Sequence, residues 1–214
     1  MKPQREQISA LRDGAMASVP LLVGIVPWGI VAGVAMVSAG LTQAQAVAMS
    51  VLVFAGSAQL AVLPLLVAKA PLWVMYATAL VVNLRYVIYS AVLAPYFEQL
   101  SKRWRALLSY ITVDQTFALF VGKYAADAEK ATRHWFFFGA SLMMWTCWQT
   151  ASLIGVLMPL LQDRAIVCAA LAGGGVALAT AKWPLNLGLL AAIAAGVAVG
   201  LSVSRASARK AGRA

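Results

Sequence analysis

Residues 83 to 90 read NLRYVIYS, a polar cluster within an otherwise apolar stretch from Pro71 to Phe97. Arg85 lies near the middle of that stretch, and so near the centre of any bilayer that the stretch crosses. A guanidinium stays charged at any ordinary pH, and holding it at the bilayer centre costs roughly 2.5 kcal/mol or more. Arg85 must therefore have polar partners or water. Two interpretations are open: it pairs with an acidic group to hold a helix bundle together, or its planar bidentate donor binds the carboxylate of a solute.

Asn83 and Tyr89 flank this arginine and extend the polar cluster. On a helix, Asn83 lies on one face, and Arg85 and Tyr89 lie on nearly the opposite face. A segment with two polar faces presents neither of them to lipid, so we expect it to be central in a bundle or unwound near Asn83. All three residues are candidates for substrate binding.

Asp114, in the sequence SYITVDQTFAL, is the one acidic residue inside a predicted membrane span. A carboxyl group in a low-dielectric site favours its protonated form unless a cation lies beside it. Asp114 could therefore take up and release protons during transport. The alternative is a static ion pair with Arg85.

Two short motifs carry residues that interrupt helices. VPWG places Pro27 and Gly29 in the first apolar segment, and FAGSAQL places Gly56, Ser57 and Gln59 in the second. Proline removes a backbone hydrogen bond and glycine weakens a helix, so either motif can free backbone groups to contact a solute. Transporters commonly bind solutes at such broken helices near the membrane midplane. Each motif alone is equally explained by a kink or by small residues that let helices pack closely. Gly29, for example, also begins a GxxxG motif with Gly33.

The composition predicts a membrane protein. The chain has 214 residues, of which 62% are hydrophobic and 11% charged, and no charged residue occurs from Gly14 to Ala68. A bilayer core of ~30 Å needs roughly 20 helical residues to cross, and continuous apolarity favours helices over barrel strands. We expect one membrane domain over residues 1–214, an all-α transmembrane bundle of about 6 or 7 hydrophobic segments. Apolar runs bounded by charge place these segments at about 15–39, 46–68, 71–97, 106–122, 135–161, 165–181 and 183–204.

The net charge of +10 is concentrated beside the apolar segments, at the N-terminus, in SKRWR at 101–105, in residues 123–134 and in the C-terminal tail. This placement is typical of cytoplasmic loops and argues against nucleic-acid binding. A cytoplasmic N-terminus together with a cytoplasmic SKRWR requires an even number of crossings before Ser101. We therefore expect that one or more of the first three segments is broken or re-entrant.

Other chemistry has little support in the sequence. Cys147 and Cys168 lie in separate apolar segments and the single histidine, His134, lies in a charged loop, so we expect no disulfide, metal site or cofactor. An intramembrane enzyme would need a nucleophile with its base, or a metal cluster. The predicted spans offer one aspartate, no histidine and no HExxH motif, so we expect no catalytic residues.

Several motifs together resemble a known family. PWG at 27–29, MSVLVFAGSAQL at 49–60, NLRYVIYSAVLAPYF at 83–97 and VDQTFAL at 113–119 closely resemble the AzlC/YgaZ family of branched-chain amino acid exporters. The resemblance covers most of residues 20–119, in order and with similar spacing. It implies a bacterial inner-membrane permease that exports valine, leucine, isoleucine and similar amino acids. It also implies a partner, a small AzlD/YgaH-type membrane subunit.

The chain departs from that family pattern at several positions. Tyr86 replaces the histidine of NLRH, Gln115 replaces a frequent acidic residue, and Tyr96 replaces the histidine of LAPH. These changes remove groups that could relay protons. A further hydrophobic stretch of the family, expected near residues 155–160, is either missing here or replaced by a bend of the fifth segment at Pro159.

The sequence therefore predicts a secondary transporter. The carboxylate of a branched-chain amino acid would bind near Arg85 and the freed backbone amides around Phe54 to Gln59, which makes Gly56, Ser57 and Gln59 candidates for substrate binding. Asp114 would couple export to proton entry or receive the substrate ammonium. Two alternatives remain: a permease for a different small solute, and an accessory membrane subunit without a pathway of its own. A homo-oligomer is also compatible with the sequence.

Overall fold

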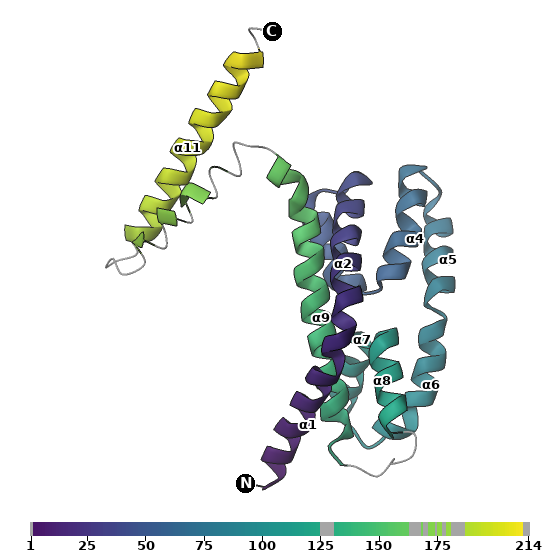
Figure 1. The fold of residues 1–214 in the computed structure, drawn as a ribbon. Helices are drawn as coiled ribbons and strands as arrows, with labels where there is room; N and C mark the ends of the chain where they lie inside the picture. The colour runs from purple at the N-terminus through teal and green to yellow at the C-terminus, as the bar shows by residue number, and fades with distance from the viewer. Residues whose placement is uncertain are drawn as a thin grey trace. The chain divides into compact units, whose positions relative to one another are not determined.

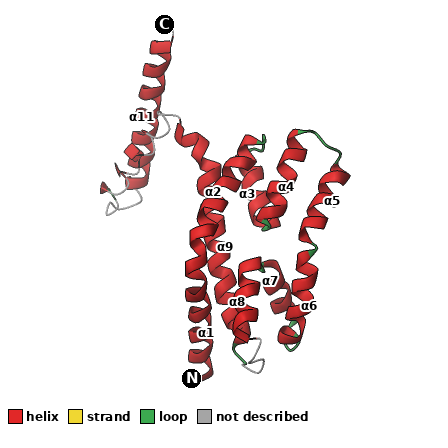
Figure 2. Cartoon of the chain, turned by 45° about the vertical axis from the view of Figure 1, so that its right-hand side comes forward, coloured by secondary structure: helices red, strands yellow, loops and turns green. Residues whose placement is uncertain are grey.

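The structure is a computed structural model that describes residues 2–124, 131–162, 168, 171–173, 175–176, 179–180 and 187–211. The described residues form helices and no strand, which confirms the predicted all-α class (Figures 1 and 2). The chain divides into two compact units, Met1–Val156 and Leu157–Ala214. One membrane domain over residues 1–214 stays a prediction.

The first unit contains the helices that form the candidate site. Their bounds are α1 Lys2–Ser18, the 3₁₀ helix η1 Val19–Leu21, α2 Leu22–Ser38, α3 Gln43–Val53, α4 Gly56–Val67, α5 Leu72–Asn83, α6 Arg85–Phe97, α7 Lys102–Tyr110, α8 Asp114–Tyr124 and α9 Arg133–Leu157. Two helical stretches within it, Gln4–Ser38 and Leu72–Phe97, are long and apolar enough to cross a bilayer.

The second unit contains η2 Met158–Gln162 and α11 Leu187–Ala211. The change from α9 to a 3₁₀ helix at Met158 lies beside Pro159, where the sequence allowed a bend. Most of the predicted segment at 165–181 lies outside the described residues, and α11 covers most of the predicted segment at 183–204.

The second predicted segment is broken, as expected from FAGSAQL. A capping box at Thr42 begins α3, which ends at Val53 and is followed by Phe54, whose φ of 30° is in the left-handed region. Non-glycine residues rarely adopt that region, and it turns the chain sharply before α4 begins at Gly56. The helices α3 and α4 therefore form a hairpin (Figure 2), and the two residues at its tip, Phe54 and Ala55, are buried.

A second hairpin, which the sequence did not predict, divides the fourth segment. Helix α7 ends at Tyr110 and α8 begins at Asp114. Side-chain hydroxyls take over backbone hydrogen bonds at this tip: Thr112 donates to the Leu108 carbonyl at 2.6 Å, and Thr116 accepts from the Val113 amide at 3.2 Å. These bonds compete with the helix ladder and stabilise the interruption.

The two hairpins enter the unit from opposite ends and their tips meet (Figures 1 and 2). The Tyr110 hydroxyl donates to the Val51 carbonyl and accepts from the Trp145 indole at 3.2 Å. The rings of Phe54 and Tyr110 are 6.2 Å apart. Four helix ends therefore lie together near the middle of the unit.

The predicted break at Pro27 and Gly29 is wrong, because α2 continues through both residues. The irregular turn lies earlier, in η1, with a proline at its start. Gly29 serves close packing instead: a Cβ there would come within 2.7 Å of the Ala151 Cβ, and one at Gly33 within 2.1 Å of the Ser152 carbonyl oxygen. The GxxxG motif is thus a contact face between α2 and α9, as small residues at a helix interface allow.

The N-terminus, the turn from α6 to α7 and the last turn of α8 lie at the same end of the unit (Figure 1). This end, called the basic end below, carries Arg5, Lys102, Arg103 and Lys123. The chain leaves it through α1 and α2, turns back within α3 and α4, and returns through α5 and α6. The hairpin explains how the N-terminus and Ser101 share one end, as the charge pattern required.

Candidate functional site

A cavity of about 560 Å³ lies where the two hairpin tips meet α2, α6 and α9. This volume is within the range of small-molecule sites, about 300 to 1,000 Å³. Its polar lining consists of Ser57, Arg85, Tyr86, Asp114 and Gln115. The remaining lining residues are apolar or aromatic: Pro20, Leu21, Gly24, Ile25, Trp28, Phe54, Gly56, Val113, Met144 and Trp148.

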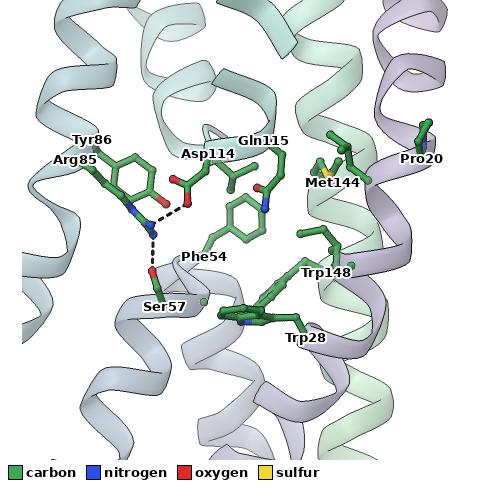
Figure 3. A pocket seen from close by; sticks show the side chains of 15 residues that line it. Pro20, Trp28, Phe54, Ser57, Arg85, Tyr86, Asp114, Gln115, Met144 and Trp148 are labelled. Atoms are coloured by element: carbon green, nitrogen blue, oxygen red, sulfur yellow. Dashed lines mark hydrogen bonds and ion pairs between the residues drawn. The ribbon is translucent and has the colours of Figure 1, made fainter. Parts of the chain in front are cut away.

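Arg85, the first residue of α6, joins both hairpins (Figure 3). Its Nη1 lies 2.8 Å from Asp114 Oδ2, and its Nη2 donates to the Ser57 hydroxyl. Its Nε is buried and has no hydrogen-bond partner among the described residues. The guanidinium therefore contacts both tips, and its Nε–H is left without an acceptor among the described residues.

The ion pair between Arg85 and Asp114 is open to the cavity. The two side chains are 31% and 41% exposed. Asp114 also accepts a hydrogen bond from the Tyr89 hydroxyl at 3.1 Å, and Tyr89 stacks on Phe117 with ring centroids 4.1 Å apart. Both charged groups can therefore be reached from the cavity without unpacking the helices.

Each hairpin tip brings the end of one helix beside the start of the next. The carboxyl ends of α3 and α7 carry partial negative charge, and the amino ends of α4 and α8 carry partial positive charge. In α4 the first helical bond runs from the Gln59 amide to the Ala55 carbonyl at 2.9 Å, so the amides of Gly56, Ser57 and Ala58 precede the helix ladder. The tips thus offer donors and acceptors in close proximity, which suits a zwitterion.

Gly56 is required where it lies. A Cβ there would approach the Trp148 ring to 2.3 Å, so a larger residue would displace the indole that forms one wall of the cavity. The Trp148 Nε1 is buried without a partner among the described residues. The prediction of Gly56 as a site residue therefore has a steric reason that the sequence did not reveal.

The structure brings together only part of the predicted set. Gly56, Ser57, Arg85 and Asp114 line the cavity, and Tyr89, which is not among the lining residues, donates a hydrogen bond to Asp114. Two other predicted substrate-binding residues also do not line the cavity: Gln59 is fully buried and donates to the Met49 carbonyl at 2.9 Å, and Asn83 ends α5 with its Oδ1 buried and unpaired in the described structure.

Sequence reasoning missed the aromatic wall of the cavity. Trp28, Phe54 and Trp148 line it, together with Met144. Met144 and Trp148 are four residues apart and hence on one face of α9, a spacing that a search for lining residues could have used. Trp28 directly follows the proline of VPWG, so the motif contributes its side chain and no helix break.

The AzlC protein family matches residues 20–161. The chain belongs to the AzlC family. The matched interval contains every residue that lines the cavity. No solved structure matches the chain.

Several curated relatives of this AzlC-family chain are membrane proteins. The inner membrane protein YgaZ of Escherichia coli strain K12 is 25% identical over 144 residues, which are 67% of this chain and 58% of the relative. An uncharacterized membrane protein of Helicobacter pylori strain 26695 is 29% identical over 154 residues, 72% of this chain and 66% of the relative. One from Archaeoglobus fulgidus is 27% identical over 212 residues, 86% of this chain and 91% of the relative.

The chain spans 58% and 66% of the lengths of the first two relatives. Family membership and the names of these relatives support a membrane location and a role in membrane transport.

Proposed function

We propose that this AzlC-family chain is a polytopic inner-membrane permease that exports branched-chain amino acids, with proton entry as the driving reaction. The observation that carries the proposal is the partly exposed pair of Arg85 and Asp114 at the tips of two opposed hairpins, inside a mostly apolar cavity. Charges near the middle of an apolar bundle are costly and are typical of solute and proton pathways. Irregular backbone at that depth is tolerated where it lines a wet cavity.

The charges of an amino acid match those of the site. Its carboxylate would bind the guanidinium of Arg85 and the amides at the start of α4, and its ammonium would bind Asp114. The substrate carboxylate takes the place of Asp114 as the partner of Arg85, and the substrate ammonium takes the place of Arg85 as the partner of Asp114. Neither side chain is then left buried and unpaired, which would cost free energy. The alkyl side chain would lie against Ile25, Phe54 and Trp148.

Proton coupling would act through the same pair. A proton arriving on Asp114 removes its charge and weakens its hold on Arg85, which frees the guanidinium for a carboxylate. A second possibility is that Asp114 stays charged and only receives the substrate ammonium. The pH dependence of exchange separates these two roles, because only the first requires Asp114 to titrate.

A small AzlD/YgaH-type membrane subunit is the proposed partner, with the N-terminus of this chain in the cytoplasm. Helix α5 has no buried residue in the described chain, and Trp73, Tyr76 and Leu80 are exposed by 72%, 74% and 66%. These apolar side chains must meet lipid or another membrane protein. The proposal includes a polytopic bundle, since the described chain contains two stretches long enough to span a bilayer.

The test is counterflow of labelled valine in proteoliposomes, with and without the small subunit. The expected result is exchange that Arg85→Gln and Asp114→Asn abolish, while Arg103→Gln, an exposed arginine of α7, retains it. An accessory subunit would instead assemble with its partner and leave transport unchanged in all three variants. Absence of flux in both preparations would reject the proposal.

Competition by unlabelled solutes tests the substrate class. Leucine and isoleucine should compete with valine. Isovalerate and isobutylamine carry similar alkyl groups but only one charge each, so they should compete weakly. Equal competition by a solute without an alkyl chain would indicate a permease for a different small solute.

A further inference from the structure

A second cavity of about 140 Å³ lies between α6 and α7. Its volume suits roughly four or five water molecules at ~30 Å³ each. Aliphatic side chains form part of its lining, and the other lining residues are Tyr86, Ser90, Phe97, Arg105, Ser109 and Thr112. Hydroxyls and a guanidinium thus line a space that the proposed transport site does not use.

Tyr86 is the one residue shared by the linings of the two cavities. Its ring lies 5.3 Å from the Arg85 guanidinium carbon and 5.7 Å from the Tyr89 ring, which it meets edge to face. Arg85 and Tyr89 both bind Asp114. Both of these neighbours of the Tyr86 ring therefore bind the carboxylate whose ion pair would open during transport.

The second cavity lies on the side of the basic end. Helix α6 runs from Arg85 at the centre of the unit to its last residue at the basic end, and α7 begins there (Figure 1). Arg105 is in the first turn of α7, where its positive charge would attract a carboxylate. The order from the basic end inward is therefore Arg105, the second cavity, Tyr86 and the central cavity.

From this arrangement we infer that the second cavity is the entry vestibule for the solute at the basic end, and that Tyr86 is the gate between this vestibule and the central site. The inference rests on the proposed permease function. In the structure Tyr86 lines both cavities. A rotation of this one side chain would join the cavities without a change in the backbone. A solute that replaces the partners of Asp114 alters both contacts of the ring, so binding and gating are coupled.

Cysteine labelling tests the gate without requiring transport. In a variant lacking Cys147 and Cys168, a single cysteine is placed at Ser109 in the vestibule or at Gln115 in the central cavity. A membrane-impermeant methanethiosulfonate reagent is then applied to vesicles of each orientation. Because the N-terminus lies at the basic end, protease access to an N-terminal tag identifies the vesicles that expose this end.

From the basic end, Ser109→Cys should react whether or not Tyr86 is present. Gln115→Cys should react slowly in the parent and about tenfold or more faster with Tyr86→Ala, the change that corresponds to ~1.4 kcal/mol of barrier. Tyr86→Phe keeps the ring and should keep the slow rate. Tyr86→Val replaces the alanine variant if that variant does not fold.

Tyr96→Ala is the matched control, since Tyr96 lies on the same helix, packs on Phe120 and lines neither cavity. An unchanged Gln115→Cys rate in Tyr86→Ala, an equal rise with Tyr96→Ala, or an unreactive Ser109→Cys would overturn the gate. Faster labelling without valine counterflow would keep the gate and reject the amino acid proposal. Counterflow with labelling that is independent of Tyr86 would reject the gate alone.

Discussion

Arg85→Lys separates a carboxylate-binding arginine from one that only holds the bundle together. Lysine keeps the positive charge but has a single donor nitrogen, whereas Arg85 uses Nη1 on Asp114 at 2.8 Å and Nη2 on Ser57. An ammonium can preserve the ion pair but cannot hold Asp114 and a planar carboxylate with two parallel hydrogen bonds. If the arginine is structural, the substitution should be nearly silent. If it binds solute, transport should fall while the fold survives.

The structure sets the expected size of the effect. A hydrogen bond to a charged group contributes ~1.5 to 3 kcal/mol, so loss of one such bond to the solute lowers exchange at limiting substrate by roughly 10- to 150-fold. The free energy of unfolding should change by less than about 1 kcal/mol, because the pair is retained and its side chains are 31% and 41% exposed. Transport and stability thus respond very differently.

The assay is the initial rate of labelled-valine counterflow over a range of valine concentrations, with thermal unfolding in detergent measured on the same samples. Arg103→Lys, a conservative change at an exposed arginine of α7, is the control and should match the parent in both measurements. Full exchange with unchanged concentration dependence in Arg85→Lys would refute the reasoning. In that case the arginine would serve only as the partner of Asp114.

Two further substitutions test the packing around the site, and a third tests a histidine outside it. A Cβ at Gly155 would lie 2.1 Å from a backbone oxygen of α2, so Gly155→Ala should lower the thermal midpoint by an amount equivalent to ~1 to 3 kcal/mol, whereas Gly122→Ala, with open space around it, should not. Gly56→Ala should displace Trp148 and abolish counterflow while the protein still reaches the membrane, as fractionation would verify. His134 lies just before the fifth predicted segment, and burial lowers its pKa below the ordinary value of about 6.5. The unfolded state therefore binds more protons than the folded state near that pH, and the free energy of unfolding falls as the pH drops through it. His134→Asn should weaken this acid sensitivity in thermal melts from pH 7.5 to 5.5.

The sequence allowed some features of the fold to be predicted because their causes are local. Continuous apolarity specifies helices in lipid, and the small polar residues after Phe54 allow the chain to turn there. The charge count required a segment that turns back before Ser101, and the α3 and α4 hairpin meets that requirement. Arg85 and Asp114 were identified because charged groups are rare and costly in such a chain.

Other features depend on contacts between distant residues, which a single sequence does not display. The interruption before Asp114 contains neither glycine nor proline and depends on threonine hydroxyls and on the opposing tip. Pro27 was expected to break α2, but the helix continues, since neighbouring helices in a membrane bundle compensate for one missing hydrogen bond. Trp148 joins the cavity only because α9 packs beside α2 through small residues.

The proposed site should discriminate more strongly between solutes that differ in charge than between solutes that differ in their alkyl side chain. A molecule with a single charge leaves either Arg85 or Asp114 without a partner, and an unpaired charged group costs more than the ~1 to 3 kcal/mol of an unpaired neutral polar group. The alkyl end meets a wall of Ile25, Phe54 and Trp148, where one methylene changes the free energy by only ~1 to 3 kcal/mol. The cavity is also larger than a tight pocket for one side chain requires. Discrimination for zwitterions should therefore be strong and discrimination among valine, leucine and isoleucine weak, a pattern that follows from the geometry of the ion pair.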